Sequence, residues 1–215
     1  RAGVHADTMN FAGGEYWRKF TQLGADHRRL REEFTRAVLA APPETDGSRL
    51  VYSNSGYLVA AQMLTRLTGQ DWETLVTRHV FVPLGMSTCG FGAPGSESVE
   101  HPAQPWPHSN ALGSKPIPVS PASAVADNPK AIGPAGIIHC SISDWLKFAK
   151  AHLDGFNGLN TPILTARGFR YLHEDYKGQG YTSGGFIYER RNGQVYLGHN
   201  GSNSMNFAIL VLDPS

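Results

Sequence analysis

The chain has 215 residues, of which 40% are hydrophobic and 17% are charged, with a formal net charge of +1. This composition is typical of an ordinary globular protein. Basic residues form no run longer than two. The sequence therefore lacks the basic clusters that bind nucleic acid or an anionic membrane. No apolar stretch approaches the roughly 18 to 20 residues that a membrane span needs, and residues 1–20 lack the order of a signal peptide.

The first predicted helix covers His27 to Ala41. Leu30, Phe34 and Val38 recur there at i, i+4 and i+8, with charged residues on the other side. This spacing is the pattern of an amphipathic helix with one buried face. Two consecutive prolines follow and end the helix.

Two further helices are predicted in the next forty residues. The segment Gly56 to Thr68 is mostly apolar all round and is followed by Gly69, so we expect a buried helix. Asp71 is placed to cap a third helix, which we expect to run to about Val80. Pro83 lies beyond this end.

Residues Gly85 to Pro134 are rich in Gly, Pro, Ser and Asn and show no sustained periodicity. A loop of this length inside a compact chain is usually functional or mobile. Its centre reads "HPAQPWPHSN" and contains Trp106.

The last third combines one helix with strands. "GPAGIIHCSISDWLKFAKAHLDG" indicates a short buried segment, a serine cap and an amphipathic helix that ends at Gly155, with Trp145, Leu146, Ala149 and Leu153 on one side. The strands are "GGFIYER", "QVYLGH" and "MNFAILVL", the first two joined by a tight Asn-Gly turn. Helices followed by an antiparallel meander predict the α+β class.

The cysteines and histidines give no metal-binding pattern. Cys89 and Cys140 permit one disulfide, but they lie about fifty residues apart in the sequence and we expect two buried thiols. The nine histidines are scattered singly, without His-Glu-x-x-His or Cys-x-x-Cys spacing. Structural or surface roles are therefore favoured for them over a metal site.

Two polar clusters interrupt apolar segments: Tyr52-Ser53-Asn54, and His199-Asn200-Gly201-Ser202. Each cluster alone has a structural interpretation. Asn54 or Ser55 is a candidate N-cap for the following helix, with Tyr52 as a half-buried aromatic residue. Residues 199–202 are candidates for a second hairpin turn.

Together with their flanking sequence, the two clusters resemble one family. "VYSNSGYLVAAQMLTRLTGQDWETLVTRHVFVPLGM" resembles the Tyr-x-Asn segment of the serine β-lactamase and penicillin-binding-protein superfamily, in the branch of class C β-lactamases, D-alanyl-D-alanine carboxypeptidases and related esterases. "AGIIHCSISDWLKFAKAHLDG" resembles a later helix of that family. "GHNGSNSMNFAILVLDP" resembles the strand that carries its His-x-Gly version of the Lys-Thr-Gly motif. The resemblance spans roughly residues 45–213.

The resemblance implies a role for each residue of the first cluster. Tyr52 is expected to exchange a proton with the nucleophilic serine and the leaving group. Since a free phenol has a pKa of about 10, this role requires cationic neighbours that favour the phenolate. The amide of Asn54 is expected to orient the substrate amide and the lysine of the nucleophile motif.

The resemblance also gives the second cluster its roles. His199 stands where other members have lysine, so its electrostatic contribution is weaker and pH-dependent. Gly201 is expected to let the substrate approach the strand, because it has no Cβ in the way. The backbone N–H of Ser202 is expected to be one donor of the oxyanion hole.

The family's Ser-x-x-Lys nucleophile motif is absent from these 215 residues. No serine stands three places before any lysine, where the residues are Tyr16, Leu112, Asp127, Asp144, Lys147 and Glu174. There is also no Gly-x-Ser-x-Gly elbow as a replacement. The opening "RAGVHADT" resembles sequence that follows the family's nucleophile region, and "ILVLDPS" stops before an expected further strand and helix.

We therefore expect a fragment of one fused catalytic domain, with residues 1–135 as a mostly helical lobe and 136–215 as a helix with antiparallel strands. Three strands alone would leave an unpaired edge and an uncovered apolar face, so the isolated chain is expected to be poorly soluble and inactive. The resemblance implies that the parent protein is exported to the periplasm or secreted.

The leading hypothesis is a serine hydrolase that acts through an acyl-enzyme on a β-lactam, a D-Ala-D-Ala peptide or an ester. The reaction by this route needs no cofactor or metal, and its partner is a small-molecule or peptide substrate. Histidine in place of lysine slightly favours an esterase or peptidase-like enzyme, because a permanent cation holds a β-lactam carboxylate better. The alternatives are a non-catalytic member that binds peptide, glycan or protein, and a structural α+β domain.

Overall fold

The computed structural model describes residues 3–22, 24–95, 104–109, 115–175 and 177–214. Its contacts divide the chain into two units. Unit 1 consists of Arg1–Thr74, Gly90–His139 and Asn203–Asn206, and unit 2 consists of Leu75–Cys89, Cys140–Ser202 and Phe207–Ser215. Two parts of the predicted loop, residues 96–103 and 110–114, lie outside the described residues.

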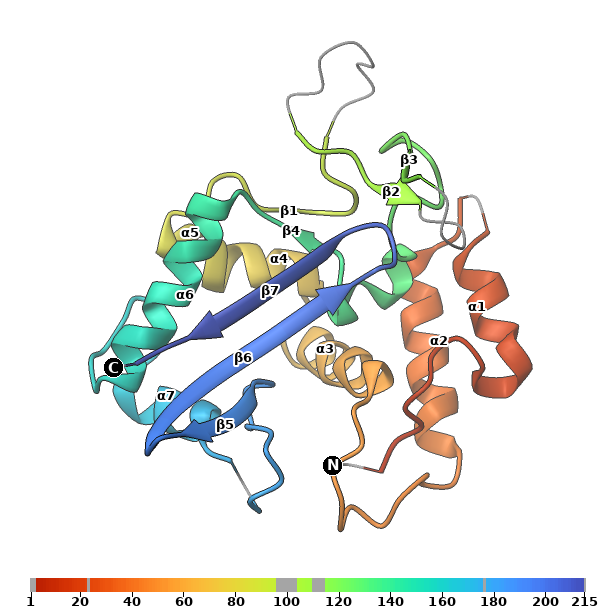
Figure 1. The fold of residues 1–215 in the computed structure, drawn as a ribbon. Helices are drawn as coiled ribbons and strands as arrows, with labels where there is room; N and C mark the ends of the chain where they lie inside the picture. The colour runs from red at the N-terminus through yellow and green to blue at the C-terminus, as the bar shows by residue number, and fades with distance from the viewer. Residues whose placement is uncertain (1–2, 23, 96–103, 110–114, 176, 215) are drawn as a thin grey trace. The chain divides into compact units, whose positions relative to one another are not determined.

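Unit 1 is built mainly from helices (Figure 1). These are η1 (Phe11–Gly14), α1 (Glu15–Phe20), α2 (His27–Ala40), α3 (Asn54–Thr68) and η3 (Lys130–Ala135). Leu30, Phe34 and Val38 of α2 are 5%, 0% and 2% exposed and lie in one hydrophobic cluster with Leu58 of α3. The amphipathic helix predicted over residues 27–41 is thus confirmed.

Helix α3 differs from its prediction. Leu58 and Ala61 are buried, on the side that contacts α2 and η3. Met63, Leu64 and Leu67 are 59%, 47% and 79% exposed, so the expectation of a helix buried all round is wrong. An apolar composition predicted burial on every side, whereas the described elements of unit 1 cover only one.

A buried arginine joins α2 to η3. Arg31 is 2% exposed, and its Nε donates to the carbonyl of Ala131 at 3.0 Å. Its Nη2 donates to the carbonyl of Lys130 at 2.9 Å and to the Glu73 carboxylate at 2.8 Å. A buried guanidinium is stable only when its donors are used in this way.

The third predicted helix begins as expected and extends further. Asp71 Oδ1 accepts a hydrogen bond from the backbone N–H of Thr74 at 2.8 Å. The chain then forms α4 (Trp72–Val76), the π-helical η2 (Thr77–Phe81) and α5 (Val82–Leu84). Pro83 does not end the helical stretch, because it lies in α5, which directly follows the π-helical turn η2, and the chain stays helical through Leu84.

The long Gly- and Pro-rich stretch contains only short elements among its described residues. Strands β1 (Gly90–Phe91) and β4 (Ile138–His139) pair with each other, as do β2 (His108–Ser109) and β3 (Ile117–Pro118). The β1–β4 pair brings Cys89 and Cys140 together in a disulfide bond. The expectation of two buried thiols is wrong, because pairing between residues 90 and 139 cannot be read from sequence separation.

Unit 2 contains the antiparallel sheet β5-β6-β7, formed by β5 (Ile187–Arg191), β6 (Gln194–Ser202) and β7 (Phe207–Leu212). The tight turn predicted at Asn192-Gly193 is confirmed, with φ of +51° and +82°. Residues Arg191 and Gln194 pair across it.

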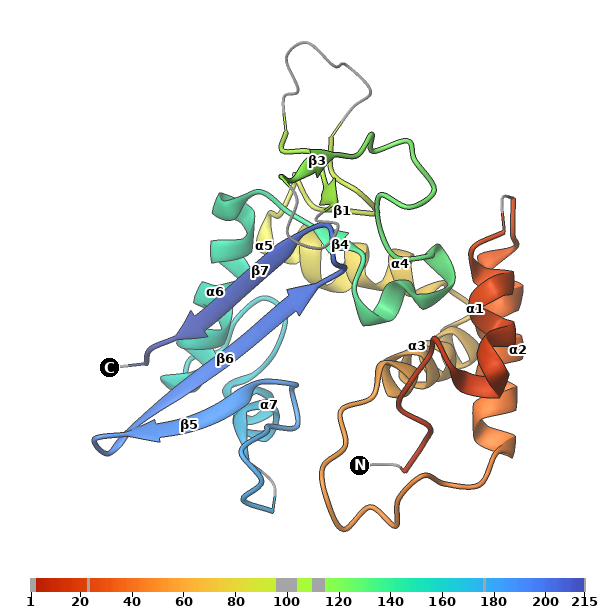
Figure 2. The same cartoon turned by 45° about the vertical axis from the view of Figure 1, so that its right-hand side comes forward.

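Helices α6 (Ile142–Phe156) and α7 (Ala166–His173) lie on the same side of this sheet (Figures 1 and 2). Ser141 caps α6 by accepting from the backbone N–H of Asp144. Ala149 of α6 packs with Leu197 and Leu212 of the sheet. Leu146 is 59% exposed, so its predicted place on the buried side is wrong. The buried residues of α6 are Asp144, Ala149, Ala151, His152 and Gly155, and at about 100° per residue their mean direction lies on the opposite side of the helix from Leu146.

On the other side of the sheet, the residues of β7 form an apolar row that is uncovered in unit 2. Phe207, Ile209 and Val211 alternate along β7 and are 64%, 57% and 62% exposed. Strand β7 is also the edge of the three-stranded sheet. The unpaired edge that the sequence predicted is present in the described residues, and the uncovered apolar surface is present along β7.

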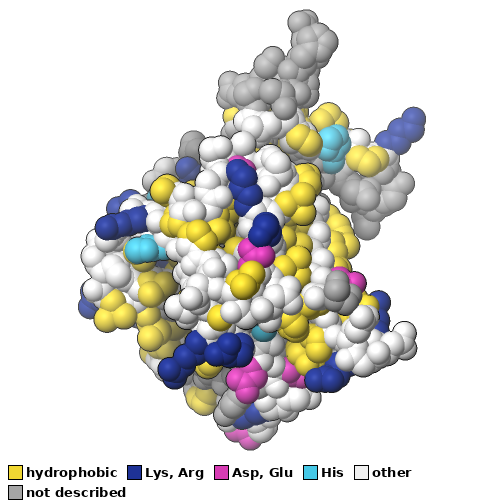
Figure 3. Space-filling model, turned by 90° about the vertical axis from the view of Figure 1, so that its left-hand side faces the viewer, with side chains coloured by type: hydrophobic (Ala, Val, Ile, Leu, Met, Phe, Trp, Pro, Cys, Tyr) yellow, Lys and Arg dark blue, Asp and Glu magenta, His cyan; other side chains and the backbone are white. Residues whose placement is uncertain are grey.

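The surface over α6 mixes charges of both signs (Figure 3). Lysines 147 and 150 form ion pairs with Asp144 and Asp154, both at 2.6 Å. In the part of the chain that the structure describes, no helix combines the length and the apolar character that crossing a membrane requires.

Candidate active site

The first predicted cluster lies at the start of α3, in unit 1. Ser53 has an extended backbone, and its Oγ accepts a hydrogen bond from the backbone N–H of Gly56 at 3.0 Å. Ser53 is therefore the N-cap, and the alternative that Asn54 or Ser55 fills this role is wrong. Asn54 is the first residue of the helix, and its amide is not consumed by capping.

Tyr52 lies just before this cap and is 49% exposed. Its ring centroid is 6.4 Å from that of Tyr57, one turn into α3. Burial raises the pKa of the Tyr52 phenol, and the neighbouring Tyr57 raises it further. Both effects favour the protonated phenol, so a phenolate here depends on a positive charge brought close to it.

The second predicted cluster lies on β6, in unit 2. The strand continues to Ser202, so the alternative of a hairpin turn at residues 199–202 is wrong. His199 pairs with Leu210 of β7, and its Nδ1 lies 2.6 Å from the carbonyl oxygen of Gly185. In the neutral imidazole this contact places the proton on Nδ1 and leaves Nε2 as the acceptor.

Gly201 lies two residues further along the same strand. A Cβ added to this glycine would meet no heavy atom within 4 Å among the described residues. Its backbone does not have the positive φ that would demand glycine. The absence of a side chain at position 201 thus keeps space open over the end of β6.

Tyr52 and Asn54 belong to unit 1, whereas His199, Gly201 and Ser202 belong to unit 2. The structure thus places two predicted residues at one helix start and three along one strand. Their convergence on a common cavity stays a prediction.

The predicted loop contributes a residue that the sequence analysis did not single out. Asp127 Oδ1 accepts a hydrogen bond from Asn203 Nδ2 at 2.7 Å, across 76 positions of the chain. Burial raises the pKa of Asp127, although the hydrogen bonds from Asn203 and the Asn128 backbone oppose this effect. Asn203 directly follows Ser202, and no sequence motif marked either partner.

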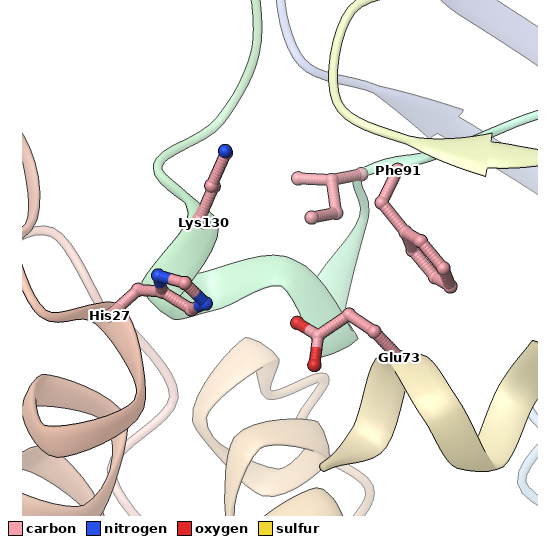
Figure 4. A pocket seen from close by; sticks show the side chains of 5 residues that line it. His27, Glu73, Phe91 and Lys130 are labelled. Atoms are coloured by element: carbon pink, nitrogen blue, oxygen red, sulfur yellow. The ribbon is translucent and has the colours of Figure 1, made fainter.

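A cavity of about 170 Å³ opens elsewhere in unit 1 (Figure 4). It is lined by His27, Glu73, Phe91, Lys130 and Ile137. The Glu73 carboxylate in its wall is paired with Arg31. None of the predicted site residues lines this cavity, so it is separate from the motifs described above.

The arrangement of helices and sheet, with Tyr-x-Asn at a helix start and His-x-Gly on a strand, defines a β-lactamase-like protein. The Beta-lactamase family model matches residues 7–215, and the chain belongs to this family. The α+β fold class and the family resemblance noted in the sequence are confirmed.

Two relatives in sequence are penicillin-binding proteins. The chain is 26% identical over 189 residues to penicillin-binding protein 4 of Amycolatopsis lactamdurans, covering 80% of this chain and 45% of the relative. It is 30% identical over 104 residues to the putative penicillin-binding protein PbpX of Bacillus subtilis, covering 48% and 24%. The chain thus spans less than half the length of these relatives.

Solved structures agree on the fold. A D-stereospecific amidohydrolase from Streptomyces aligns with a TM-score of 0.68 and 16% identity, covering 99% of this chain and 62% of that one. An octameric penicillin-binding protein homologue from Pyrococcus abyssi aligns with a TM-score of 0.64 and 20% identity, covering 90% and 42%. At these identities the likeness shows the fold alone.

Proposed function

We propose that this chain is the acid–base and oxyanion part of a serine hydrolase that works through an acyl-enzyme. The observation that carries the proposal is the order of two motifs, Tyr-x-Asn and His-x-Gly, inside a family match over residues 7–215. The nucleophile and its lysine come from sequence outside these residues, because Ser-x-x-Lys is not among them.

In the proposed mechanism, Tyr52 relays the proton of the nucleophilic serine to the leaving group. Burial and Tyr57 raise the pKa of the phenol, so the lysine of the nucleophile motif must supply the charge that favours its ionisation. The amide of Asn54 orients the substrate and that lysine. It fixes geometry and moves no proton.

The strand residues act on the acyl group. The Nε2 atom of His199 is the acceptor of the neutral ring, because Nδ1 is engaged by Gly185. Gly201 leaves room for the substrate over the strand. The backbone N–H of Ser202 is one oxyanion donor, and the N–H of the nucleophile is the other.

The proposed substrate is a β-lactam, a D-Ala-D-Ala peptide or an ester. We favour a peptide or ester, because position 199 holds an imidazole where the resemblance expects a lysine, and the permanent cation of lysine holds a β-lactam carboxylate better. An oxidising compartment, periplasmic or extracellular, is supported by the disulfide between Cys89 and Cys140. Penicillin-binding relatives are in keeping with this location.

The test requires the complete reading frame. The purified protein is incubated with a fluorescent penicillin and with a fluorophosphonate, and labelled protein is resolved on a denaturing gel. We expect one labelled serine, in a Ser-x-x-Lys motif, and loss of labelling in Tyr52→Phe. Labelling that is absent from the full-length protein contradicts the proposal.

A second candidate is a non-catalytic binding protein of the same fold. It is favoured by the lack of a nucleophile motif within the 215 residues. The sequence of the complete reading frame distinguishes the two, because a binding protein has no need of Ser-x-x-Lys.

A further inference from the structure

The connection between β6 and β7 is shaped by one side chain. Asn203 Oδ1 accepts hydrogen bonds from the backbone N–H groups of Met205 at 3.0 Å and Asn206 at 2.6 Å. Ser204 has a φ of +71°, a left-handed conformation that a residue other than glycine adopts only when the surrounding structure requires it. The Asn203 side chain therefore fixes the path of this four-residue connection.

The same connection is held by the long irregular stretch. Asn203 Nδ2 donates to Asp127 Oδ1 at 2.7 Å, and the backbone N–H of His108 donates to the carbonyl of Met205 at 3.1 Å. Asp127 Oδ1 also accepts from the backbone N–H of Asn128 at 2.7 Å. Two separate segments of the stretch thus contact residues 203–206, all within unit 1.

We propose that Asp127 and Asn203 are positioning residues for acyl transfer, acting through the connection on the Gly201-Ser202 end of β6. This inference rests on the proposed function. Neither side chain is assigned a contact with substrate. Asn203 directly follows Ser202, so a shift of its backbone moves the peptide groups that the mechanism assigns to the oxyanion and to substrate approach.

The hydrogen bond from Asn203 to Asp127 is additional to those that close the connection itself. The Oδ1 atom of Asn203 already forms the hydrogen bonds that hold the connection together. The carboxylate of Asp127, 76 positions away in the chain, is not required for this. Burial works against the charge of Asp127, as its raised pKa shows. The Asp127 hydrogen bond therefore adds a second anchor to a connection that Asn203 Oδ1 already closes, and such an anchor serves to hold a neighbouring catalytic backbone group in place.

The experiment measures the acylation rate of the complete protein with the fluorescent penicillin or the fluorophosphonate. Asp127→Ala and Asn203→Ala should slow acylation by roughly 10- to 100-fold, the range expected when an oxyanion donor is misplaced. Asp127→Asn keeps an acceptor oxygen and should stay within about threefold of wild type. Asp154→Asn, a carboxylate paired with Lys150 on α6, is the matched control and should leave the rate unchanged.

Exchanging the side chains of Asp127 and Asn203 tests whether their hydrogen bond, rather than the packing of the two side chains, supports acylation. Asn203→Asp places two carboxylates against each other, so acylation should be slow at pH 7 and recover as the pH falls and one carboxyl becomes a donor. The double variant Asp127→Asn with Asn203→Asp restores a donor and an acceptor. It should regain the wild-type rate to within about threefold at pH 7.

Two further measurements exclude a loss of folding. Thermal unfolding of each variant is compared with Asp144→Ala, which loses hydrogen bonds to Thr88 in unit 2 and controls for general destabilisation. Hydrogen exchange followed by mass spectrometry should show faster exchange in peptides covering residues 200–206 of Asp127→Ala. Peptides from α2 should be unchanged.

The inference is overturned if Asp127→Ala and Asn203→Ala acylate at the wild-type rate. It is also overturned if the double exchange stays as slow as Asn203→Asp, or if Asp144→Ala slows acylation as much as Asp127→Ala. A full-length wild-type protein that takes no label overturns the proposed function, and this inference with it. Failure of this inference and failure of the proposed function are distinguishable, because only failure of the proposed function leaves the wild-type protein unlabelled.

Discussion

Cys89 and Cys140 form a disulfide bond that joins the two ends of the segment 90–139, with their Cα atoms 4.1 Å apart. Gly90 and His139, the residues next to them, pair in the β1–β4 ladder. The segment between them carries β2, β3, η3 and Asp127. One covalent bond therefore closes the part of unit 1 that contacts the β6–β7 connection.

Removal of this bond should destabilise the chain through the unfolded state. The two cysteines are separated by 51 positions, and a loop of this length corresponds to about 4 kcal/mol in the chain-entropy description. We expect Cys89→Ser with Cys140→Ser to lower the free energy of unfolding by about 2 to 4 kcal/mol, measured by urea denaturation. Wild type treated with a reductant is the control and should match the double variant. A thiol assay of the unreduced, denatured protein should find no free thiol, and two free thiols would contradict the bond.

Two glycines of unit 2 should respond oppositely to alanine. A Cβ at Gly155 would lie 2.1 Å from the Phe169 ring, where α6 and α7 pack together, whereas a Cβ at Gly201 would meet open space. Gly155→Ala should lower the thermal midpoint by several degrees or prevent folding, because a packed helix interface cannot absorb the methyl group. Gly201→Ala should unfold within about 1 °C of wild type.

The same Gly201→Ala variant, made in the full-length protein, should slow acylation by at least 10-fold if the substrate passes over β6. An unchanged rate would show that the space above Gly201 has no part in catalysis. A large loss of stability in Gly201→Ala would show instead that the glycine is structural.

Local chemistry made much of the fold predictable. The i, i+4, i+8 spacing in α2, the cap at Asp71 and the Asn192-Gly193 turn each depend on residues within one or two turns of the chain, and all three are present. Tyr-x-Asn lies at a helix start and His-x-Gly on a strand, as the resemblance implied, although the strand expected from the residues alone ended at His199 and β6 continues to Ser202. The short helices α1 and α7 were not predicted, because neither has the length for a clear apolar period.

Contacts between distant segments were not predictable in the same way. The disulfide depends on the register of β1 against β4, and the Asp127–Asn203 hydrogen bond depends on where an irregular stretch meets a hairpin connection. No repeating pattern of apolar residues in the sequence predicts either contact. The exposed side of α3 was mispredicted for a related reason. Apolar residues favour burial, but the sequence does not show which other segment would cover them.

The buried side chain of Arg31 is expected to stabilise unit 1 through its ion pair and hydrogen bonds. Its guanidinium donates to Glu73 and to two carbonyls of η3 while being 2% exposed. Arg31→Ala leaves these acceptors without their donor and should lower the free energy of unfolding by about 3 to 5 kcal/mol, measured by urea denaturation. Arg28→Ala is the matched control, because Arg28 pairs with Asp71 at the surface and should contribute less than about 1 kcal/mol. Equal losses in the two variants would contradict the role given to Arg31.

A buried pair of histidines predicts how stability depends on pH. His152 Nδ1 lies 2.9 Å from His173 Nε2, both residues are 5% exposed, and Phe156, Phe169 and Phe186 surround them. Burial lowers the pKa of each histidine from 6.5 to about 4, and His173 adds to the effect on His152. Between pH 4 and pH 6.5 the unfolded chain therefore binds more protons than the folded chain, so stability rises with pH across this window and is lost as the pH falls through it.

We expect the thermal midpoint to fall steadily from pH 7 to pH 4.5 in wild type. The double variant His152→Leu with His173→Leu should lose most of this dependence, because it has no imidazole to protonate in the apolar interior, and at pH 5 it should be at least as stable as wild type. His79→Gln, a change at an exposed histidine of η2, is the control and should keep the wild-type profile. If the double variant retained the full slope between pH 4.5 and pH 6.5, other titrating groups would have to account for the acid sensitivity. The buried pair would then have no part in it.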